Sequence, residues 1–331
     1  MATQGTDAVV TEKPKPKVDP NTILSSQVAQ GMAIIGDRYA FMIIRDIYLG
    51  VRQFEELRRR SGAARGTLAS RLKTLVNHGI IYKNPYQSSP IRFEYRLTDK
   101  GLDLYPVVLM MWNWETKWGK GRHLPPTLTH KSCGKEMHPL MRCSQCHKAA
   151  LPQDIKFSPG KNAVSAKKIP PRFQRRSKLK VEHGDEVDQR FFTVLDVIGD
   201  RWTSLVIAAA FFGLQRFDNI ASSIGIATNI LADRLKLLVG VGVLDRSPYQ
   251  DKPVRYEYHL SGKGRDLYPQ TLAIHEWADR WLIKKGTSPL ILTHLPCNKL
   301  FVSEIVCSHC AQPLIAAEVL FQKEVVHRHT A

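Results

Sequence analysis

An internal repeat constrains the fold of this 331-residue chain more than any other feature of its sequence. The motif Ile-Gly-Asp-Arg begins at Ile35 and again at Ile198, an offset of 163 residues. The same offset relates Pro-Tyr-Gln at 85–87 to 248–250, and Asp-Leu-Tyr-Pro at 103–106 to 266–269. It still holds for Trp118 and Trp281. A duplication of this length without a gap predicts one fold used twice, which means two domains rather than the many short repeats of a solenoid.

The composition indicates a globular protein with a polyanionic partner. The chain is 43% hydrophobic and 24% charged, and its 48 Lys and Arg exceed its 30 Asp and Glu by 18. Such an excess favours nucleic acid or an anionic membrane surface, and charge alone does not choose between them. The polar N-terminal residues lack the apolar core of a signal peptide, and no apolar run is long enough to span a bilayer. We therefore expect a cytoplasmic protein without a membrane partner, in which six cysteines are thiols or metal ligands rather than disulfides.

The periodicity of each repeat predicts a winged helix-turn-helix. In the first repeat we expect helices over 27–35, 38–49, 53–60 and 65–78, strands over 80–84 and 92–97, and a last helix over 99–118 interrupted near Pro106. The fourth helix carries one apolar stripe, formed by Leu68, Leu72, Leu75 and Val76 and repeated by Leu231, Leu235, Leu238 and Val239. Such a helix fits the major groove of DNA, and the hairpin can reach the backbone or an adjacent groove. The alternative is a winged helix that serves as a protein–protein module.

Several spaced motifs of both repeats resemble those of the HxlR-type transcriptional regulators of bacteria. The second repeat reads IGDRWTSLVI, then RFDNIASSIGIATNILADRLKLLVGVGVL, the wing YQDKPVRYEYHLSGKGRDLYP and the helix end EWADRW. The first reads IGDRYAFMII, QFEELRRRSGAARGTLASRLKTLVNHGII and SPIRFEYRLTDKGLDLYP, so the match runs over about 26–119 and 189–284. The resemblance implies double-stranded DNA as the partner. It also implies a pseudo-dimer within the chain, because single-copy members pair through their first and last helices; a further homodimer is left open. Ser26 and Gln189 stand where redox-sensing members carry a cysteine, so thiol sensing by that route is not expected.

The phase of the fourth helix gives the residues expected to contact DNA. With the leucine stripe turned inward, the outward face differs between the repeats, so two binding repeats would read different half-sites. Ser70 and Asn229 are expected to bond base edges, and Lys73 and Lys236 to bind phosphate. A weakly binding second repeat is the alternative, because Asp233 disfavours phosphate. The full set comprises Arg65, Gly66, Thr67, Ser70, Arg71, Lys73, Arg92, Thr228, Asn229, Asp233, Arg234, Lys236 and Arg255.

Four arginines of this set have a structural alternative. Arg71 and Arg234 lie nearer the core edge of the helix, where a salt bridge is at least as good an interpretation as a DNA contact. The wing residues Arg92 and Arg255 are expected at the backbone or minor groove. Their alternative is an ion pair within the hairpin, with Glu94 or Glu257 two residues along the same strand.

The six cysteines fall into two matching sets with the spacing H-x2-C-x9-C-x2-C. The first is His130, Cys133, Cys143 and Cys146, and the second, now offset by 164 residues, is His294, Cys297, Cys307 and Cys310. Three cysteines and a histidine are a usual tetrahedral zinc set, so we predict two structural Zn²⁺ sites, one within each repeat. The alternative is a reduced hairpin with packed thiols and no metal, and His138, His147 and His309 are other nearby histidines.

Together these patterns predict an α+β, mainly helical chain with two winged helix-turn-helix domains in tandem, each followed by a small zinc-ribbon-like Cys/His hairpin. The expected order is a disordered tail (1–22), the first winged helix (23–122), its hairpin (123–150), a basic flexible linker (151–185), the second winged helix (186–286), its hairpin (287–320) and a tail (321–331). The linker is either a spacer or an arm that lies along phosphates.

The predicted function is a sequence-specific regulator of transcription that binds double-stranded DNA, a repressor on a pseudo-palindromic operator, located in the bacterial cytoplasm with the nucleoid. The alternative is a zinc-bearing RNA-binding or protein-scaffold module. No Walker loop, nucleophile elbow or paired acid/base set is present, so no enzyme is expected. A small-molecule effector is left open, in an apolar pocket near Trp112, Trp114, Trp277 and Trp281, although these tryptophans are also suited to a core.

Overall fold

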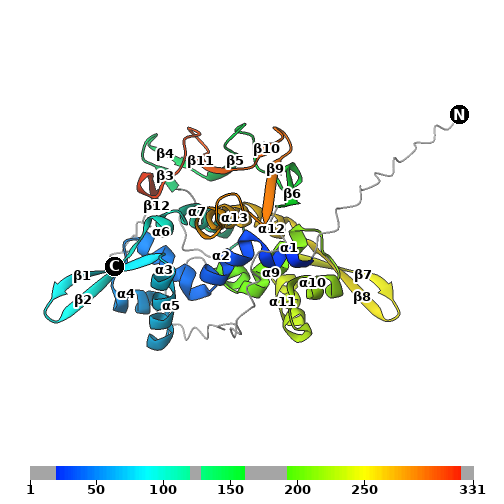
Figure 1. Ribbon diagram of the computed structural model, residues 1–331, viewed down its shortest axis with the longest axis horizontal. Coiled ribbons are helices and arrows are strands. Elements are labelled where there is room, and N and C mark those ends of the chain that lie inside the picture. The colour runs from blue at the N-terminus through cyan, green and yellow to red at the C-terminus, as the bar shows by residue number, and fades with distance from the viewer. Residues whose placement is uncertain (1–19, 120–127, 161–191, 322–331) are drawn as a thin grey trace, which may run out of the picture.

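The computed structural model describes residues 20–119, 128–160 and 192–321, and within them the same winged helix occurs twice (Figure 1). The first copy consists of α2 (Gln27–Ile35), α3 (Arg38–Tyr48), α4 (Phe54–Ser61), α5 (Arg65–Asn77), β1 (Ile81–Ser88), β2 (Ile91–Leu97), α6 (Asp99–Leu102) and α7 (Tyr105–Trp118). The second consists of α8 (Phe192–Ile198), α9 (Arg201–Phe211), α10 (Phe217–Ile224), α11 (Thr228–Gly240), β7 (Leu244–Asp251), β8 (Val254–Leu260), α12 (Gly262–Arg265) and α13 (Tyr268–Leu282). The tandem repeat is therefore confirmed, and the helices lie within one or two residues of their predicted bounds. A helix that the sequence did not reveal, α1 (Pro20–Ser25), begins inside the segment expected to be a tail.

The leucine stripes hold α5 and α11 against the core; these fourth helices of the two copies are called the recognition helices below. Leu68, Leu72 and Leu75 of α5 are at most 1% exposed, and α5 packs on α3. The equivalent leucines of α11 are buried to the same extent, and α11 packs on α9. Burying one such side chain contributes about 1.5–3 kcal/mol, so each stripe fixes the opposite face of its helix toward solvent.

The repeated Ile-Gly-Asp-Arg motif lies where the two copies meet. Asp37 and Asp200 are the N-caps of α3 and α9, and each carboxylate accepts hydrogen bonds from two backbone N–H groups of the helix it begins. A β-carbon at Gly36 would lie 2.3 Å from the carbonyl oxygen of Met32, so only glycine allows the chain to pass there. Asp37 and Asp200 also pair with each other in an antiparallel bridge. The motif therefore begins a helix in each copy and joins the copies.

Reciprocal contacts interlock the two winged helices. α2 packs against α13 and α1 against α10, while α8 packs against α7 and α3. The indole of Trp114 donates to the carbonyl of Lys263 at 3.0 Å, and Trp277 donates to the carbonyl of Lys100 at 2.9 Å. Trp118 and Trp281 likewise donate to aspartates of the other repeat. These tryptophans thus stabilise the contact between repeats.

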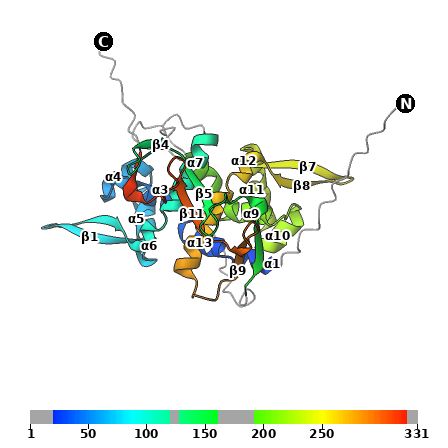
Figure 2. The ribbon, with the colours of Figure 1, turned by 90° about the horizontal axis from the view of Figure 1, so that it is seen from above.

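The strands that follow each winged helix form one shared structure, the Cys/His module (residues 128–160 and 290–321). The first repeat contributes β3 (Leu128–His130), β4 (Lys135–Met137), β5 (Pro139–Cys143), η1 (Pro152–Asp154) and β6 (Ile155–Pro159), and the second contributes β9 (Leu290–His294), β10 (Lys299–Leu300), β11 (Ser303–Cys307), η2 (Ala316–Glu318) and β12 (Val319–Phe321). The sheets have the orders β10-β9-β6, β11-β5 and β12-β3-β4, so each contains strands of both repeats. Seen from above, β5 and β11 lie side by side over the middle of the molecule, with the wings at opposite ends (Figure 2).

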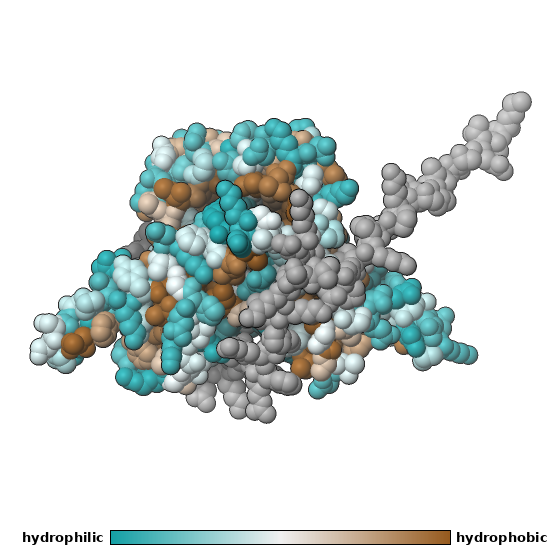
Figure 3. All heavy atoms as spheres, viewed as in Figure 1, coloured by the Kyte–Doolittle hydropathy of each residue, from teal (hydrophilic) through white to brown (hydrophobic). Residues whose placement is uncertain are grey.

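The expectation of two self-contained hairpins was wrong. A short hairpin leaves unpaired edge strands, and here β9 and β3 each pair on their outer edge with a strand of the other repeat, β6 and β12 respectively. Residues 151–160, which we expected to begin the linker, form η1 and β6. Hydrophobic side chains line the seam beneath the module, whereas its outer rim is mainly hydrophilic (Figure 3). The remaining linker residues 161–185 and the tail segments 1–19 and 322–331 lie outside the described residues. Within the described ranges, no helix combines the length and apolar character needed to cross a membrane.

His275, near the contact between the repeats, is expected to make the stability of the fold sensitive to acid. Burial lowers the pKa of the His275 imidazole on α13 to about 4, against the opposing effect of Asp279. The His275 imidazole takes up a proton near pH 6.5 in the unfolded chain but not in the folded chain. The stability of the folded chain that depends on a neutral His275 is therefore present above pH 6.5 and is lost as the pH falls toward 4. Between pH 7 and 4.5, we expect the wild-type protein to lose about 2 kcal/mol more unfolding free energy than His275→Leu, which has no imidazole to protonate. Urea unfolding at both pH values measures this, and equal losses in the two proteins would contradict it.

Candidate nucleic-acid interface and metal centres

The two recognition helices lie on the same side of the molecule. In Figure 1, α5 and α11 project from the lower face, the wings β1–β2 and β7–β8 extend to the two ends, and the Cys/His module covers the opposite side. The α2–α13 and α1–α10 contacts fix this arrangement. One face of the chain therefore presents two helices and two hairpins together, as a protein that reads duplex DNA requires.

The predicted residues of the first recognition helix face solvent. Gly66, Ser70 and Lys73 are exposed on α5, and Thr67 is half-buried. The exposed Arg65 donates to the Glu55 carboxylate at 2.8 Å. Lys73 has no ion pair among the described residues, so its charge is available to a ligand.

The second recognition helix has a different exposed face. Thr228, Asn229, Asp233 and Lys236 are all exposed on α11. Asn229 stands at the position of Gly66, and Asp233 at that of Ser70, by the offset of 163 residues. The Asp233 carboxylate accepts a hydrogen bond from Arg234, which offsets part of the negative charge that this helix would bring near phosphate.

Arg71 and Arg234 connect the recognition helices to the repeated motif. Arg71 Nε lies 2.8 Å from the Asp37 carboxylate, and Arg234 Nη2 lies 2.7 Å from the Asp200 carboxylate. The Arg234 side chain is only 7% exposed, and that of Arg71 is 23% exposed. This geometry favours the structural alternative for both arginines: each fixes its helix to the N-cap at the centre of the molecule.

The wing arginines do not form the ion pairs considered from the sequence. Arg92 is exposed, and Glu94 instead accepts hydrogen bonds from Asn84 and Arg96, which lower the pKa of its carboxyl. In the second wing, Glu257 accepts from Arg216 at 2.8 Å, so the charge of Arg255 is not neutralised by Glu257.

Arg216 was missed by the sequence analysis. It precedes α10, its guanidinium lies 4.4 Å from the ring centre of Tyr249 in the wing, and it bonds Glu257 on β8. It therefore holds the second wing against the helical core. Arg216 and Glu257 are 41 residues apart in the chain, so no local sequence pattern indicated that they pair.

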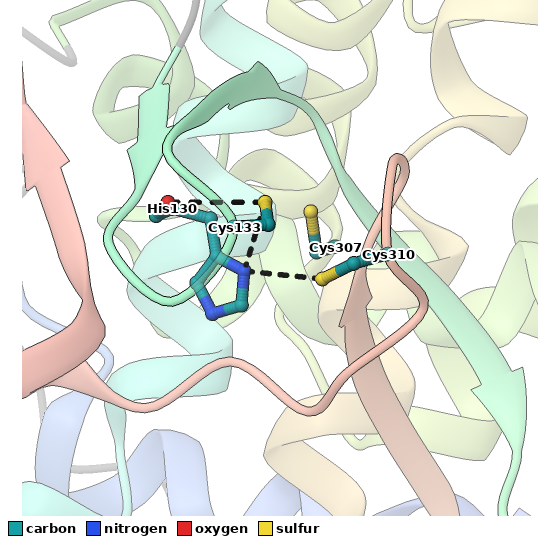
Figure 4. Close-up of side chains that lie close together, drawn as sticks. All are labelled: His130, Cys133, Cys307 and Cys310. Carbon is teal, nitrogen blue, oxygen red and sulfur yellow. Dashed lines mark hydrogen bonds between the residues drawn. The ribbon is translucent and has the colours of Figure 1, made fainter.

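The metal-ligand residues gather into two clusters, and each cluster is shared between the repeats. One contains His130, Cys133, Cys307 and Cys310, as Figure 4 shows, and the other contains Cys143, Cys146, His294 and Cys297. The eight predicted residues are all present, but their pairing within a repeat was wrong. Pairing of β5 with β11 carries the C-x2-C turn at the end of each strand toward the H-x2-C turn of the other repeat.

The donor atoms of both clusters fit a tetrahedral metal ion. In each cluster all four atoms lie within 4.8 Å of one another. Cys310 Sγ lies 3.3 Å from His130 Nδ1, and Cys146 Sγ lies 3.2 Å from His294 Nδ1. Zinc with thiolate and imidazole ligands places neighbouring donor atoms about 3.6 Å apart. These separations are therefore close to those that one bound ion would impose.

The surroundings of the ligands also suit a metal. The last ligand of each H-x2-C and C-x2-C turn is followed by a residue in the left-handed region, namely Gly134, His147, Asn298 and Ala311, which closes the turn around the ligand pair. Backbone hydrogen bonds lower the pKa of the Cys146 and Cys310 thiols and so favour thiolates. The Nε2 atom of His294 lies 3.4 Å from the carbonyl of Ala149, which leaves Nδ1 to face the cysteines.

Comparison with known proteins identifies the two winged helices. The model of the HxlR-like helix-turn-helix family matches residues 34–123 and 197–286. An HTH-type transcriptional regulator of Mycobacterium tuberculosis is 38% identical over 125 residues, which cover 38% of this chain and 79% of that protein. The regulator YvaP of Bacillus subtilis is 35% identical over 29% of this chain and 91% of its own length. Among solved structures, a transcription factor of Pseudomonas aeruginosa is 32% identical over 37% of this chain and 74% of its own, with a TM-score of 0.25. The family matches fall on the two copies of the winged helix described above and leave out the Cys/His module; this chain belongs to the HxlR-like helix-turn-helix family and contains its domain twice.

Proposed function

We propose that this protein is a sequence-specific regulator of transcription that binds double-stranded DNA with both winged helices. The observation that carries the proposal is the placement of α5 and α11 on one face, with a wing beyond each helix. The net charge of +18 supports a phosphate-rich partner. The named regulators among its relatives support the same function. We further propose repression, because a protein bound across an operator blocks access of polymerase to it.

The operator is proposed to be a pseudo-palindrome with unequal half-sites. The fixed contact between repeats sets the separation of the half-sites, about one helical turn of DNA. Asn229 and Asp233 can read adenine and cytosine, whereas the equivalent Gly66 and Ser70 leave a smaller and less specific surface. A symmetric operator would place one of the two helices on bases that it does not match.

Zinc is proposed at both Cys₃His clusters as a structural ion. A closed set of four protein ligands leaves no open position for substrate, so the ion would stabilise the fold. His130, Cys133, Cys307 and Cys310 would hold one ion, and the remaining four ligands the other. Because each set joins two repeats, bound zinc would restrain the module that covers α7 and α13.

Fluorescence anisotropy with DNA from the intergenic regions beside the gene tests the proposal. We expect sequence-dependent binding that weakens steeply with salt, as counterion release requires. Single-stranded RNA of the same length is the discriminating competitor, because Tyr86 and Phe93 of the first wing are 45% and 43% exposed and are able to stack on bases. Preference for the RNA, or binding without sequence dependence, would contradict the proposed function.

Removing a lysine from the recognition face is expected to weaken binding to all sequences. Lys73→Ala deletes one phosphate contact, so the slope of log K against log salt falls by about 1. Lys236→Ala has the same effect if the second repeat also contacts DNA. Lys135→Ala, which removes the same charge from β4 of the Cys/His module, is the matched control and leaves both affinity and slope unchanged. An effect of Lys135→Ala equal to that of Lys73→Ala would show that only the net charge matters.

Removing the amide of the second recognition helix is expected to relax specificity at one base pair. Asn229→Ala should cost about 1–3 kcal/mol on the preferred operator and much less on the operator with that base changed. Anisotropy titrations over single-base operator variants measure the difference. Uniform weakening across all variants would assign Asn229 to the backbone instead.

A further inference from the structure

An apolar cavity lies at the contact between the two repeats. It has a volume of about 80 Å³ and lies where α2 of the first repeat, β6 and β9 of the module, and α9 and α13 meet. Its walls are mainly apolar and include Val28, Phe157, Phe212 and Leu292. His275 and Leu272 also line a neighbouring, more polar pocket of about 420 Å³, so the inner cavity adjoins a route toward the surface.

The first repeat has larger side chains at two of the equivalent positions. Trp112 occupies the position of His275 and is fully buried, and Arg45 occupies that of Ala208, which lines the cavity. Arg45 is buried in an ion pair with Asp46. The second repeat thus has two smaller residues facing the same region of an otherwise repeated fold. The side chains that bound the space therefore differ between the copies at these two positions.

His275 presents a polar group in the wall of this cavity that a ligand can use. The hydroxyl of Thr271 donates to the carbonyl of Leu267, and that of Ser26 donates to the carbonyl of Ile23. His275 makes no hydrogen bond to any residue in the described part of the chain. Since burial lowers its pKa to about 4, the His275 imidazole is neutral at pH 7. It can then donate a hydrogen bond to an uncharged group or accept one from it. A charged ligand would lose its hydration against apolar walls without an opposite charge to replace it.

We propose that this cavity, extended into the adjoining pocket that shares His275, binds a compact, uncharged aromatic molecule with one hydrogen-bonding group directed at His275, and that the bound molecule changes the affinity of the protein for DNA. The second part rests on the proposed function. The cavity wall includes Ala208 and Phe211 of α9, and α9 is the helix on which α11 packs. The opposite wall belongs to α2 of the first repeat. A ligand between them contacts both the support of one recognition helix and the contact between repeats.

Fluorine NMR with 4-fluorophenol tests the cavity in the zinc-loaded full chain. We expect one saturable site per chain, with at least tenfold weaker binding of fluorobenzene, which lacks the hydroxyl, and of 4-fluorobenzoate, which is charged. His275→Trp, which introduces the residue of the first repeat, should abolish binding, and Ala208→Leu should fill the cavity from the other wall. His275→Leu keeps the space but loses the imidazole, so it should weaken 4-fluorophenol about tenfold and leave fluorobenzene unchanged. Trp112→His in the first repeat is the matched control and keeps the site.

The outcomes separate the two parts of the proposal. Binding of 4-fluorophenol that is absent, or that is unchanged in both His275→Trp and Ala208→Leu, overturns the cavity as a ligand site. If the wild-type protein binds the probe, operator affinity with and without it should differ at least threefold, and not in His275→Trp. An unchanged operator affinity overturns the regulatory part alone. Failure to bind any operator would refute the proposed function, while the NMR result would still decide the cavity.

Discussion

Replacing Cys133 and Cys310 together is expected to leave one zinc ion per chain, whereas replacing Cys133 and Cys146 together is expected to leave none under competition with a chelator. The first pair belongs to one cluster, so the other cluster keeps all four ligands. The second pair lies within one repeat and removes one ligand from each cluster. Loss of a direct ligand lowers zinc affinity by more than the ~10–100-fold that follows from loss of a residue hydrogen-bonded to a ligand. Elemental analysis after dialysis against 4-(2-pyridylazo)resorcinol counts the retained zinc.

The wild-type chain, with two zinc ions expected, and the single variant Cys133→Ala, with one, are the controls. Pairing of ligands within each repeat would give the reverse pattern: none for Cys133→Ala with Cys310→Ala, and one for Cys133→Ala with Cys146→Ala. Both double variants remove the same number of thiols, so a general effect of cysteine loss on folding would lower them equally. Absence of zinc from the wild-type protein would contradict the metal proposal itself.

Loss of the Arg234 guanidinium is expected to destabilise the chain by about 3 kcal/mol or more. Its side chain and that of Asp200 are 7% and 9% exposed, so Arg234→Ala leaves a buried carboxylate without its partner. The equivalent pair Arg71–Asp37 is 23% and 13% exposed, and Arg71→Ala should therefore cost clearly less. Urea unfolding of the zinc-loaded proteins at pH 7, followed by circular dichroism, compares the two.

Asp200→Asn separates the two roles of the aspartate. An amide oxygen can still accept from the N–H groups of Trp202 and Thr203, so the cap of α9 is retained while the charge is lost. Combining Asp200→Asn with Arg234→Ala should therefore recover part of the stability lost in Arg234→Ala alone. No recovery, or a larger loss in Arg71→Ala, would contradict a dominant buried ion pair.

The sequence predicted those parts of the fold that depend on interactions between residues close together in the chain. The leucine spacing of α5, the N-cap Asp37 and the strand alternation of β2 each depend on residues within a few positions, and repetition at a fixed offset reinforced every one of them. The exposed face of each recognition helix followed from the same periodicity. Local patterns therefore sufficed for the winged helix and for most of its candidate interface.

Local sequence patterns could not predict which metal ligands share a cluster. Both repeats carry the same four ligands at the same spacing, so pairing within a repeat and pairing across repeats use identical motifs. Only the pairing of β5 with β11 decides between them, and these strands are more than 150 residues apart. β6 was missed for a related reason. Its Ile155 and Phe157 alternate with polar residues over only five positions, and its partner strand β9 lies more than 130 residues further along the chain.

The interlocked repeats have a consequence for the order in which the chain folds during synthesis. The buried face of α2, at Gln27–Ile35, is covered by α13, at Tyr268–Leu282, and β3 is completed by β12, at Val319–Phe321. Domains usually fold as units while the ribosome is still extending the chain. Here the first winged helix emerges with its outermost helix uncovered and with half of each metal site missing, and it stays so until nearly the whole chain has been made. Because contacts this distant in sequence form slowly, final assembly is expected to follow release of the chain, and truncation near the C-terminus should impair the first repeat as much as the second.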